Sequence, residues 1–288
     1  MQKLVDKLLR RVYHLAINKK GDNIMKKLIA IALAALMVLS LAACAAKEAA
    51  PAATEAAEAP AFTTVQPGKL IMVTNAAFPP YEFIADDGST ITGIDAEICG
   101  MIAKELGLEL QIEDMEFASL LTAVQTGKAD VAMAGLTVTE ERKQNVNFSQ
   151  SYAKGVQSVI VPEGSDIKSI DDLAGKKIGV QEATTGHIYC EGDFGAENCT
   201  AYSNGANAVE ALLAGKVDCV VIDNNPAKEF VKANAGLQIL DTAYTEEDYA
   251  AAMSKDNEAL LKAFDEVLKA KIADGTVQQI LDKYISAK

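Results

Sequence analysis

The chain has 288 residues and a formal net charge of −13, with 50% hydrophobic residues and two histidines. Residues 1–43 hold 8 of the 27 basic and 2 of the 40 acidic residues, so the remainder carries a net charge of −19. This acidic balance argues against nucleic acid as a partner, because phosphates are bound by basic patches. Only His187 follows residue 43, which excludes a multi-histidine metal site, and we expect no cofactor.

A secretory signal is predicted over residues 25–43. Met25-Lys26-Lys27 is followed by an apolar run from Leu28 to Leu41 and then by two alanines, and a basic start, a short hydrophobic segment and small residues mark such a signal. Cys44 comes directly after them, as in a bacterial lipobox. We therefore expect Cys44 to be lipidated and the protein to be anchored at the outer face of the cytoplasmic membrane. The alternative is a transmembrane anchor with an incidental cysteine, for which the run is short.

Two flanking segments are expected to lie outside the folded part. Residues 1–24 fit nothing that precedes a signal, and we interpret them as an upstream extension, with translation starting at Met25. Residues 44–66 are rich in alanine, glutamate and proline, a composition with little to bury, and they are predicted to be a flexible tether. About 220 residues follow, which suits two lobes better than one core.

A repeated pattern predicts two similar α/β lobes. Gly127 to Val131 ends a helical segment and opens an apolar run, and Gly215 to Cys219 does the same. Glycine suits the left-handed position that ends a helix, and the apolar run suits a buried strand. Parallel strands separated by helices follow, although such units also recur by chance. Equal offsets from the two glycines place Gly135 and Asp223 at equivalent strand ends, where open parallel sheets bind ligands.

Two charged residues are candidates for ligand recognition. Arg142 is the only arginine after the signal, and a guanidinium binds a carboxylate through two parallel hydrogen bonds, which lysine cannot reproduce. Asp223 ends a predicted strand and could bind an ammonium group. Together they would match the two charges of a zwitterion held between lobes. The plainer alternatives are a solvated arginine and an aspartate that caps the next helix.

Aromatic residues and cysteines complete the list of candidates. Phe78, directly after the first predicted strand, could pack on the side chain of a ligand, as could Phe117. Cys190 and Cys199 lie close enough in sequence for a disulfide in an exported protein, with free buried thiols as the alternative.

Four segments resemble the family of polar amino-acid-binding proteins of ATP-driven importers. The resemblance runs from about Lys69 to the C-terminus. It implies a periplasmic-binding-protein-like fold of type II, in which two lobes, each a sheet flanked by helices, are joined by two crossing strands. Lobe 1 would comprise residues 67–154 and 250–288, and lobe 2 residues 155–249. The segments are Asn75–Phe83, Gly93–Glu97, Ala134–Arg142 and Val180–Gly186.

The resemblance also implies roles for individual residues. Arg142 would grip the α-carboxylate of an amino acid, helped by Thr137 and by backbone at Thr184 and Thr185. Asp223 and the carbonyl of Gly135 would bind the α-ammonium group, and Phe78 and Phe117 would sandwich the side chain. A permease and its ATPase are the implied partners, with the protein acting as a monomer.

Departures from the family pattern bear on specificity. Asn75 stands where many relatives have aspartate and Gln181 where some have lysine, which favours a neutral polar ligand, whereas Glu182 leaves a cationic ligand open. Ala183 replaces a frequent glycine. Two other functions remain: an exported dehydratase acting on cyclic amino acids, which would need a positioned acid or base, and an amino-acid sensor.

Overall fold

The computed structural model describes residues 62–241 and 243–285 of the chain. The described residues belong to one compact unit, and within it two separate sheets define two lobes. The upstream extension, the signal peptide, Cys44 and most of the tether predicted from the sequence lie outside the described residues. Within the described residues, no helix combines the length and apolar character that a membrane span needs.

Lobe 1 is built on a five-stranded sheet with the order β5-β1-β6-β14-β7. β1 pairs in parallel with β5 and β6, and β14 runs antiparallel to β6 and β7. The interior strand β1 is buried from Leu70 to Thr74, as expected for a parallel strand covered on both faces. The strands are β1 (Lys69–Thr74), β5 (Glu109–Asp114), β6 (Val131–Ala132), β7 (Val146–Phe148) and β14 (Ala252–Ser254).

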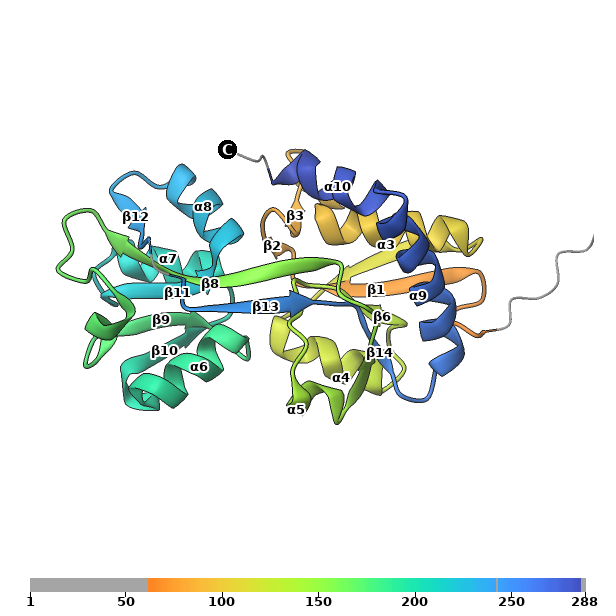
Figure 1. Ribbon diagram of the computed structural model, residues 1–288, viewed down its shortest axis with the longest axis horizontal. Coiled ribbons are helices and arrows are strands. Elements are labelled where there is room, and N and C mark those ends of the chain that lie inside the picture. The colour runs from red at the N-terminus through yellow and green to blue at the C-terminus, as the bar shows by residue number, and fades with distance from the viewer. Residues whose placement is uncertain (1–61, 242, 286–288) are drawn as a thin grey trace, which may run out of the picture. The chain divides into compact units, whose positions relative to one another are not determined.

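A small antiparallel sheet and six helical segments complete lobe 1. α3 and α10 cover one side of the sheet and α4 the other (Figure 1). The small sheet has the order β2-β3-β4. Its strands are β2 (Ala77–Phe78), β3 (Glu82–Ile84) and β4 (Ile91–Thr92). The helices are α3 (Ile94–Glu105), the 3₁₀ turn η1 (Phe117–Ser119), α4 (Leu120–Gln125), α5 (Glu140–Lys143), α9 (Glu258–Ala273) and α10 (Thr276–Tyr284).

Lobe 2 has a sheet of the order β10-β9-β11-β8-β12, with β13 also paired to β8. β9 is parallel to β10 and β11, whereas β8 is antiparallel to its neighbours. The strands are β8 (Ala153–Pro162), β9 (Ile178–Gln181), β10 (Cys199–Tyr202), β11 (Cys219–Asp223), β12 (Leu237–Ile239) and β13 (Thr245–Tyr249). The helices are η2 (Ile170–Leu173), α6 (Thr185–Phe194), η3 (Ala196–Asn198), α7 (Gly205–Leu213) and α8 (Asn224–Ala233).

Two crossing strands connect the lobes, as the family resemblance implied. β8 and β13 pair antiparallel, with Lys154 opposite Asp248 and Ala153 opposite Tyr249, and they run side by side between the two sheets (Figure 1). Gly155 is required at this crossing, because a Cβ there would lie 2.5 Å from the Tyr249 ring. A side chain at position 155 would therefore clash with the Tyr249 ring on the other connecting strand.

The repeated sequence pattern corresponds to a repeated structure. Gly127 and Gly215 have φ values of 69° and 66° and end α4 and α7. The carboxylates of Asp130 and Asp218, three residues further on, both accept a main-chain N–H at 2.8 Å, from Ile71 and Lys177 respectively. In each lobe, the aspartate just before one strand (β6 or β11) is therefore hydrogen-bonded to the start of the neighbouring parallel strand (β1 or β9). The prediction of equivalent units is confirmed.

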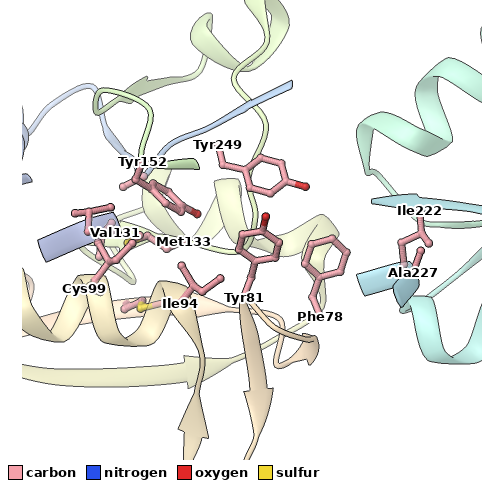
Figure 2. Close-up of a cluster of buried hydrophobic side chains, with 14 of the residues drawn as sticks. Phe78, Tyr81, Ile94, Cys99, Val131, Met133, Tyr152, Ile222, Ala227 and Tyr249 are labelled. Atoms are coloured by element: carbon pink, nitrogen blue, oxygen red, sulfur yellow. The ribbon is translucent and has the colours of Figure 1, made fainter. Parts of the chain in front are cut away.

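Aromatic side chains fill the junction of the lobes. The rings of Tyr81 and Tyr249 meet edge to face with centroids 5.1 Å apart, and Phe78 stacks on Tyr81 at 5.9 Å. Figure 2 shows these rings between the interior of lobe 1 and Ile222 of lobe 2. The aromatic segment after β1 thus belongs in part to the core, where the apolar area that it removes from water stabilises the fold.

Candidate functional site

A cavity with about 300 Å³ of empty space, part of it open to solvent, lies between the lobes. All nine residues predicted to bind the ligand line it. Three further residues line its wall: Thr185, whose backbone the family resemblance had implicated, and Glu82 and Ala134, which were not predicted. The predicted nine are Asn75, Phe78, Phe117, Gly135, Thr137 and Arg142 from lobe 1, with Gln181, Thr184 and Asp223 from lobe 2.

The carboxyl ends of parallel strands supply several of these residues. Asn75 follows β1, Ala134 and Gly135 follow β6, Gln181 ends β9, and Asp223 ends β11. The strand ends of the two lobes face the same cavity, which is the position where open α/β sheets bind small ligands.

Arg142 is buried in the cavity wall, with 8% of its surface exposed. Its Nη1 donates to the carbonyl of Thr137 at 2.8 Å, and its Nη2 donates across the cavity to the carbonyl of Ala183 at 3.1 Å. The guanidinium carbon lies 5.5 Å from the centre of the Phe117 ring, a cation–π geometry. The solvated alternative is thus wrong for this arginine.

No ion pair formed by the residues that the structure describes involves Arg142. Burial lowers the pKa of the guanidinium, and the charge of Glu247 opposes this effect. A guanidinium has five N–H donors and stays protonated in proteins, so donors remain for an anion. A buried cation without a partner is costly, and the site is therefore suited to a carboxylate guest.

Asp223 is the acid of the cavity that lies in lobe 2. Its Oδ2 accepts from Nε2 of Gln157 at 2.8 Å, and its Oδ1 accepts from the Tyr249 hydroxyl. Burial, and then the charge of Glu247, raise the pKa of Asp223 to about 7. It precedes α8, but its side chain makes no capping hydrogen bond, so the helix-cap alternative is wrong.

Gly135 is required at its position by close packing. Its φ is 52°, and a Cβ there would lie 2.8 Å from the Phe78 ring. Its N–H donates to Oδ2 of Asp95 at 2.9 Å, and the Tyr152 hydroxyl donates to the same oxygen at 2.8 Å. Asp95 thus fixes the backbone that forms one wall of the cavity.

Glu82 is the functional candidate that the sequence analysis overlooked. It is completely buried in β3, and neither of its oxygens receives a hydrogen bond from a donor of the described residues. Burial, and then the charge of the neighbouring Asp95, raise its pKa well above the usual range. Such a pair must hold a proton between them. The available signal was a charged residue between Tyr81 and Phe83 in a buried strand.

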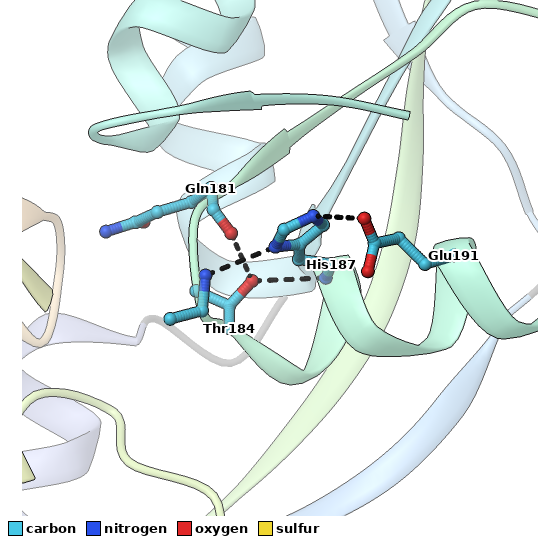
Figure 3. A network of polar contacts seen from close by, with 5 residues as sticks. Gln181, Thr184, His187 and Glu191 are labelled. Atoms are coloured by element: carbon cyan, nitrogen blue, oxygen red, sulfur yellow. Dashed lines mark hydrogen bonds and ion pairs between the residues drawn. The ribbon is translucent and has the colours of Figure 1, made fainter. Parts of the chain in front are cut away.

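Thr184 begins helix α6 at the edge of the cavity. Its hydroxyl donates to the carbonyl of Gln181 at 2.8 Å and accepts from the N–H of His187 at 3.3 Å. The His187 ring accepts from the Ala183 N–H through Nδ1 and lies 3.1 Å from Glu191 through Nε2 (Figure 3). These contacts hold the α6 N-terminus, and with it the carbonyl that Arg142 contacts.

Two other expectations can be compared with the structure. Glu182 is exposed and does not line the cavity, whereas Glu82 does. Cys190 and Cys199 are free thiols here, the first buried and the second half-buried, and a disulfide between them stays a prediction. The described residues contain no cluster of potential metal ligands.

Residues 70–287 match the bacterial extracellular solute-binding proteins, family 3. The chain belongs to this family. Two relatives of this solute-binding protein are the L-cystine-binding protein TcyJ of Escherichia coli, 30% identical over 76% of this chain and 84% of that one, and the arginine-binding extracellular protein ArtP of Bacillus subtilis, 32% identical over 76% and 87%.

Solved structures confirm the predicted fold. An ancestral arginine-binding protein bound to glutamine is 36% identical, with a TM-score of 0.73 over 77% of this chain and all of that chain. The similar proteins are named as binding proteins of amino acids and not as enzymes. The chain is accordingly an extracytoplasmic solute-binding protein of the kind that serves ABC transporters, and the dehydratase alternative is set aside.

Proposed function

We propose that this solute-binding protein captures a polar L-amino acid by closure of its two lobes and delivers it to an ABC permease. One observation carries the proposal: a buried guanidinium, Arg142, and a buried carboxylate, Asp223, line one cavity from opposite lobes. An α-amino acid has the complementary pair of charges. Neither lobe alone can satisfy both, so binding favours the closed arrangement.

Each charged end of the ligand has a proposed partner. The free N–H donors of Arg142 bind the α-carboxylate, and the Thr137 hydroxyl and the backbone at Thr184 add further hydrogen bonds. The α-ammonium group lies against Asp223 and the carbonyl of Gly135. Hydrogen bonds from charged groups to a carboxylate are about twice as strong as neutral ones, so these contacts dominate affinity.

The side-chain pocket favours ligands that donate hydrogen bonds. Phe78 and Phe117 supply apolar walls, and Glu82 supplies carboxyl oxygens without a protein donor. With Asp223 also present, the cavity holds two acids and one cation, so an acidic side chain is disfavoured. Cationic side chains and side-chain amides, which have N–H donors, are the proposed class.

The proposed partners are a permease and its ATPase in the cytoplasmic membrane. The protein would be held at the outer face by a lipid on Cys44, as a monomer, with residues 44–66 as the tether. Replacement of Cys44 by alanine should move the protein from the membrane fraction to the soluble fraction of its native host. Retention in the membrane fraction would contradict the anchor.

Thermal melting against the twenty amino acids and L-cystine tests the function. A ligand present at 100 times its Kd raises stability by about 2.7 kcal/mol, which a melting curve resolves. We expect at least one polar amino acid to raise Tm, and Arg142→Ala and Asp223→Ala to abolish the rise. Lys143→Ala, an exposed neighbour of Arg142, is the matched control and should respond as the wild type does. Unchanged affinity in both site variants would refute the assignment.

A further inference from the structure

The carboxylate of Asp223 is held by side chains from both strands that connect the lobes. Gln157 lies on β8, directly opposite Asp223 in the antiparallel pairing with β11, and Tyr249 is the last residue of β13. Each donates to a different oxygen of the carboxylate. Asp223 is therefore oriented by the two connecting strands β8 and β13, which together form the hinge, and not by its own strand β11 alone.

The Gln157 amide also separates two acids. Its Nε2 donates to Oδ2 of Asp223 at 2.8 Å and to Oε2 of Glu247 at 2.9 Å. Both carboxylates are buried, and two like charges this close raise the cost of ionising either one. An amide that donates one hydrogen to each carboxylate reduces that cost.

The hydroxyl of Tyr249 occupies the other side of the carboxylate. The backbone of Tyr249 bridges to Thr137 in the cavity wall of lobe 1, and its ring packs against Gly155 and Tyr81. Its position thus depends on how β13 leaves lobe 2 and enters lobe 1. A change in the crossing of the strands would move the hydroxyl relative to Asp223.

We propose that Gln157 and Tyr249 are positioning residues that keep the Asp223 carboxylate ionised and aimed at the α-ammonium group of the ligand. The inference rests on the proposed function and extends it from the cavity to the hinge. It makes recognition of the ammonium group depend on the arrangement of the two connecting strands, so that lobe closure and charge recognition are linked through these side chains.

Competition between a proton and the ammonium group gives the measurable consequence. Burial and Glu247 raise the pKa of Asp223 to about 7, whereas the hydrogen bonds from Tyr249 and Gln157 lower it. The charge of Asp223 in turn raises the pKa of Tyr81, Glu82 and Tyr189. The cation in the same cavity wall is Arg142, which belongs to the other lobe and is common to the wild type and the variants. Below pH 7, the ligand must therefore displace a proton, and affinity falls.

Titration calorimetry from pH 5.5 to 8.5 tests the inference. The probe is the amino acid that gives the largest rise in Tm in the panel described above. For Tyr249→Phe and Gln157→Leu, we expect the pH midpoint of the affinity to rise by about one unit. With a wild-type midpoint near 7, this makes the affinity at pH 7 roughly fivefold weaker, and the loss approaches tenfold at lower pH. At pH 8.5 the affinities should approach that of the wild type.

Tyr152→Phe is the matched control, because it removes a buried hydroxyl that donates to a different carboxylate, Asp95. It should leave the pH midpoint in place. A loss of affinity in Tyr249→Phe that is the same at every pH, or a shift no larger than in Tyr152→Phe, would overturn the positioning role while leaving the function intact. A wild type that binds no amino acid would overturn the function and this inference together.

Discussion

The side-chain amide of Gln181 in lobe 2 donates to the side-chain carbonyl of Asn75 in lobe 1, with 2.9 Å between the two atoms. Asn75 in turn donates to the carbonyl of Met115 at 2.9 Å, which fixes the orientation of its amide. Both side chains are buried in the cavity wall. Two residues that the sequence presents as separate departures from a family pattern therefore form one neutral contact between the lobes.

A double-mutant cycle measures this contact. The hydrogen bond needs both lobes in place, so its loss should weaken ligand binding more than it lowers the stability of either lobe. Asn75→Ala and Gln181→Ala should show a coupling of about 1 kcal/mol in the binding free energy, roughly a fivefold change in Kd. Titration calorimetry on the single and double variants is the measurement. Strictly additive effects would show that the contact contributes nothing to closure.

Glu82 should decide which side chains the cavity accepts. Glu82→Gln removes a carboxyl whose oxygens have no protein donor, so cationic amino acids should lose about tenfold in affinity, the loss of one charge-assisted hydrogen bond. Amino acids with neutral side chains should change by less than threefold. The measurement is the ratio of Kd values for L-arginine and L-glutamine, or for whichever cationic and neutral amino acids bind.

The exposed Glu182 provides the control for this comparison. Glu182→Gln also replaces a carboxyl by an amide but does not touch the cavity, so the ratio should stay at its wild-type value. If both substitutions shift the ratio equally, long-range charge and not contact with Glu82 governs selectivity. If neither shifts it, Glu82 serves only the fold.

Ala183 adopts a left-handed conformation with φ of 61°. This conformation costs an L-residue about 1–2 kcal/mol, whereas glycine adopts it freely. Ala183→Gly should therefore raise the free energy of unfolding by about 1 kcal/mol, after the larger entropy loss of glycine on folding is included. Urea unfolding without ligand measures the change. Ala85→Gly, at a half-buried turn residue with no positive φ, should not stabilise the protein.

The fold and much of the site follow from local sequence patterns. Gly127 and Gly215 end helices before buried strands, and equal spacing from them located Gly135 and Asp223 at strand ends that face one cavity. Arg142 stood out because no other arginine follows the signal. These signals are visible in the sequence because helix ends and strand periodicity are determined by a few neighbouring residues, and a rare residue type is recognisable by itself.

The hinge contacts could not be predicted in the same way. Gln157 contacts Asp223, 66 positions away, and Glu247, 90 positions away. Glu82 appeared to be part of an aromatic core segment, because a strand pattern does not tell which face meets a cavity. Such contacts depend on how two lobes pack, which local propensity does not encode.

The Glu82–Asp95 pair should make stability fall as pH rises. Burial raises the pKa of Asp95 to about 6, against about 3.9 in the unfolded chain. Between these values the unfolded state releases a proton that the folded state retains. Stability is therefore fully present below about pH 4 and is lost as pH rises through 6, by about 3 kcal/mol if Asp95 acts alone.

Asp95→Asn should remove this loss. An asparagine carbonyl can still accept from Gly135 and Tyr152, and its amide can donate to Glu82, but the side chain cannot titrate. The difference in unfolding free energy between pH 4 and pH 7, measured by urea without ligand, should be smaller in the variant than in the wild type. Asp86→Asn, at an exposed acid, should keep the wild-type difference. An undiminished fall in Asp95→Asn would mean that the proton held in the cavity wall resides on other groups, Asp223 among them, whose pKa is also raised by burial.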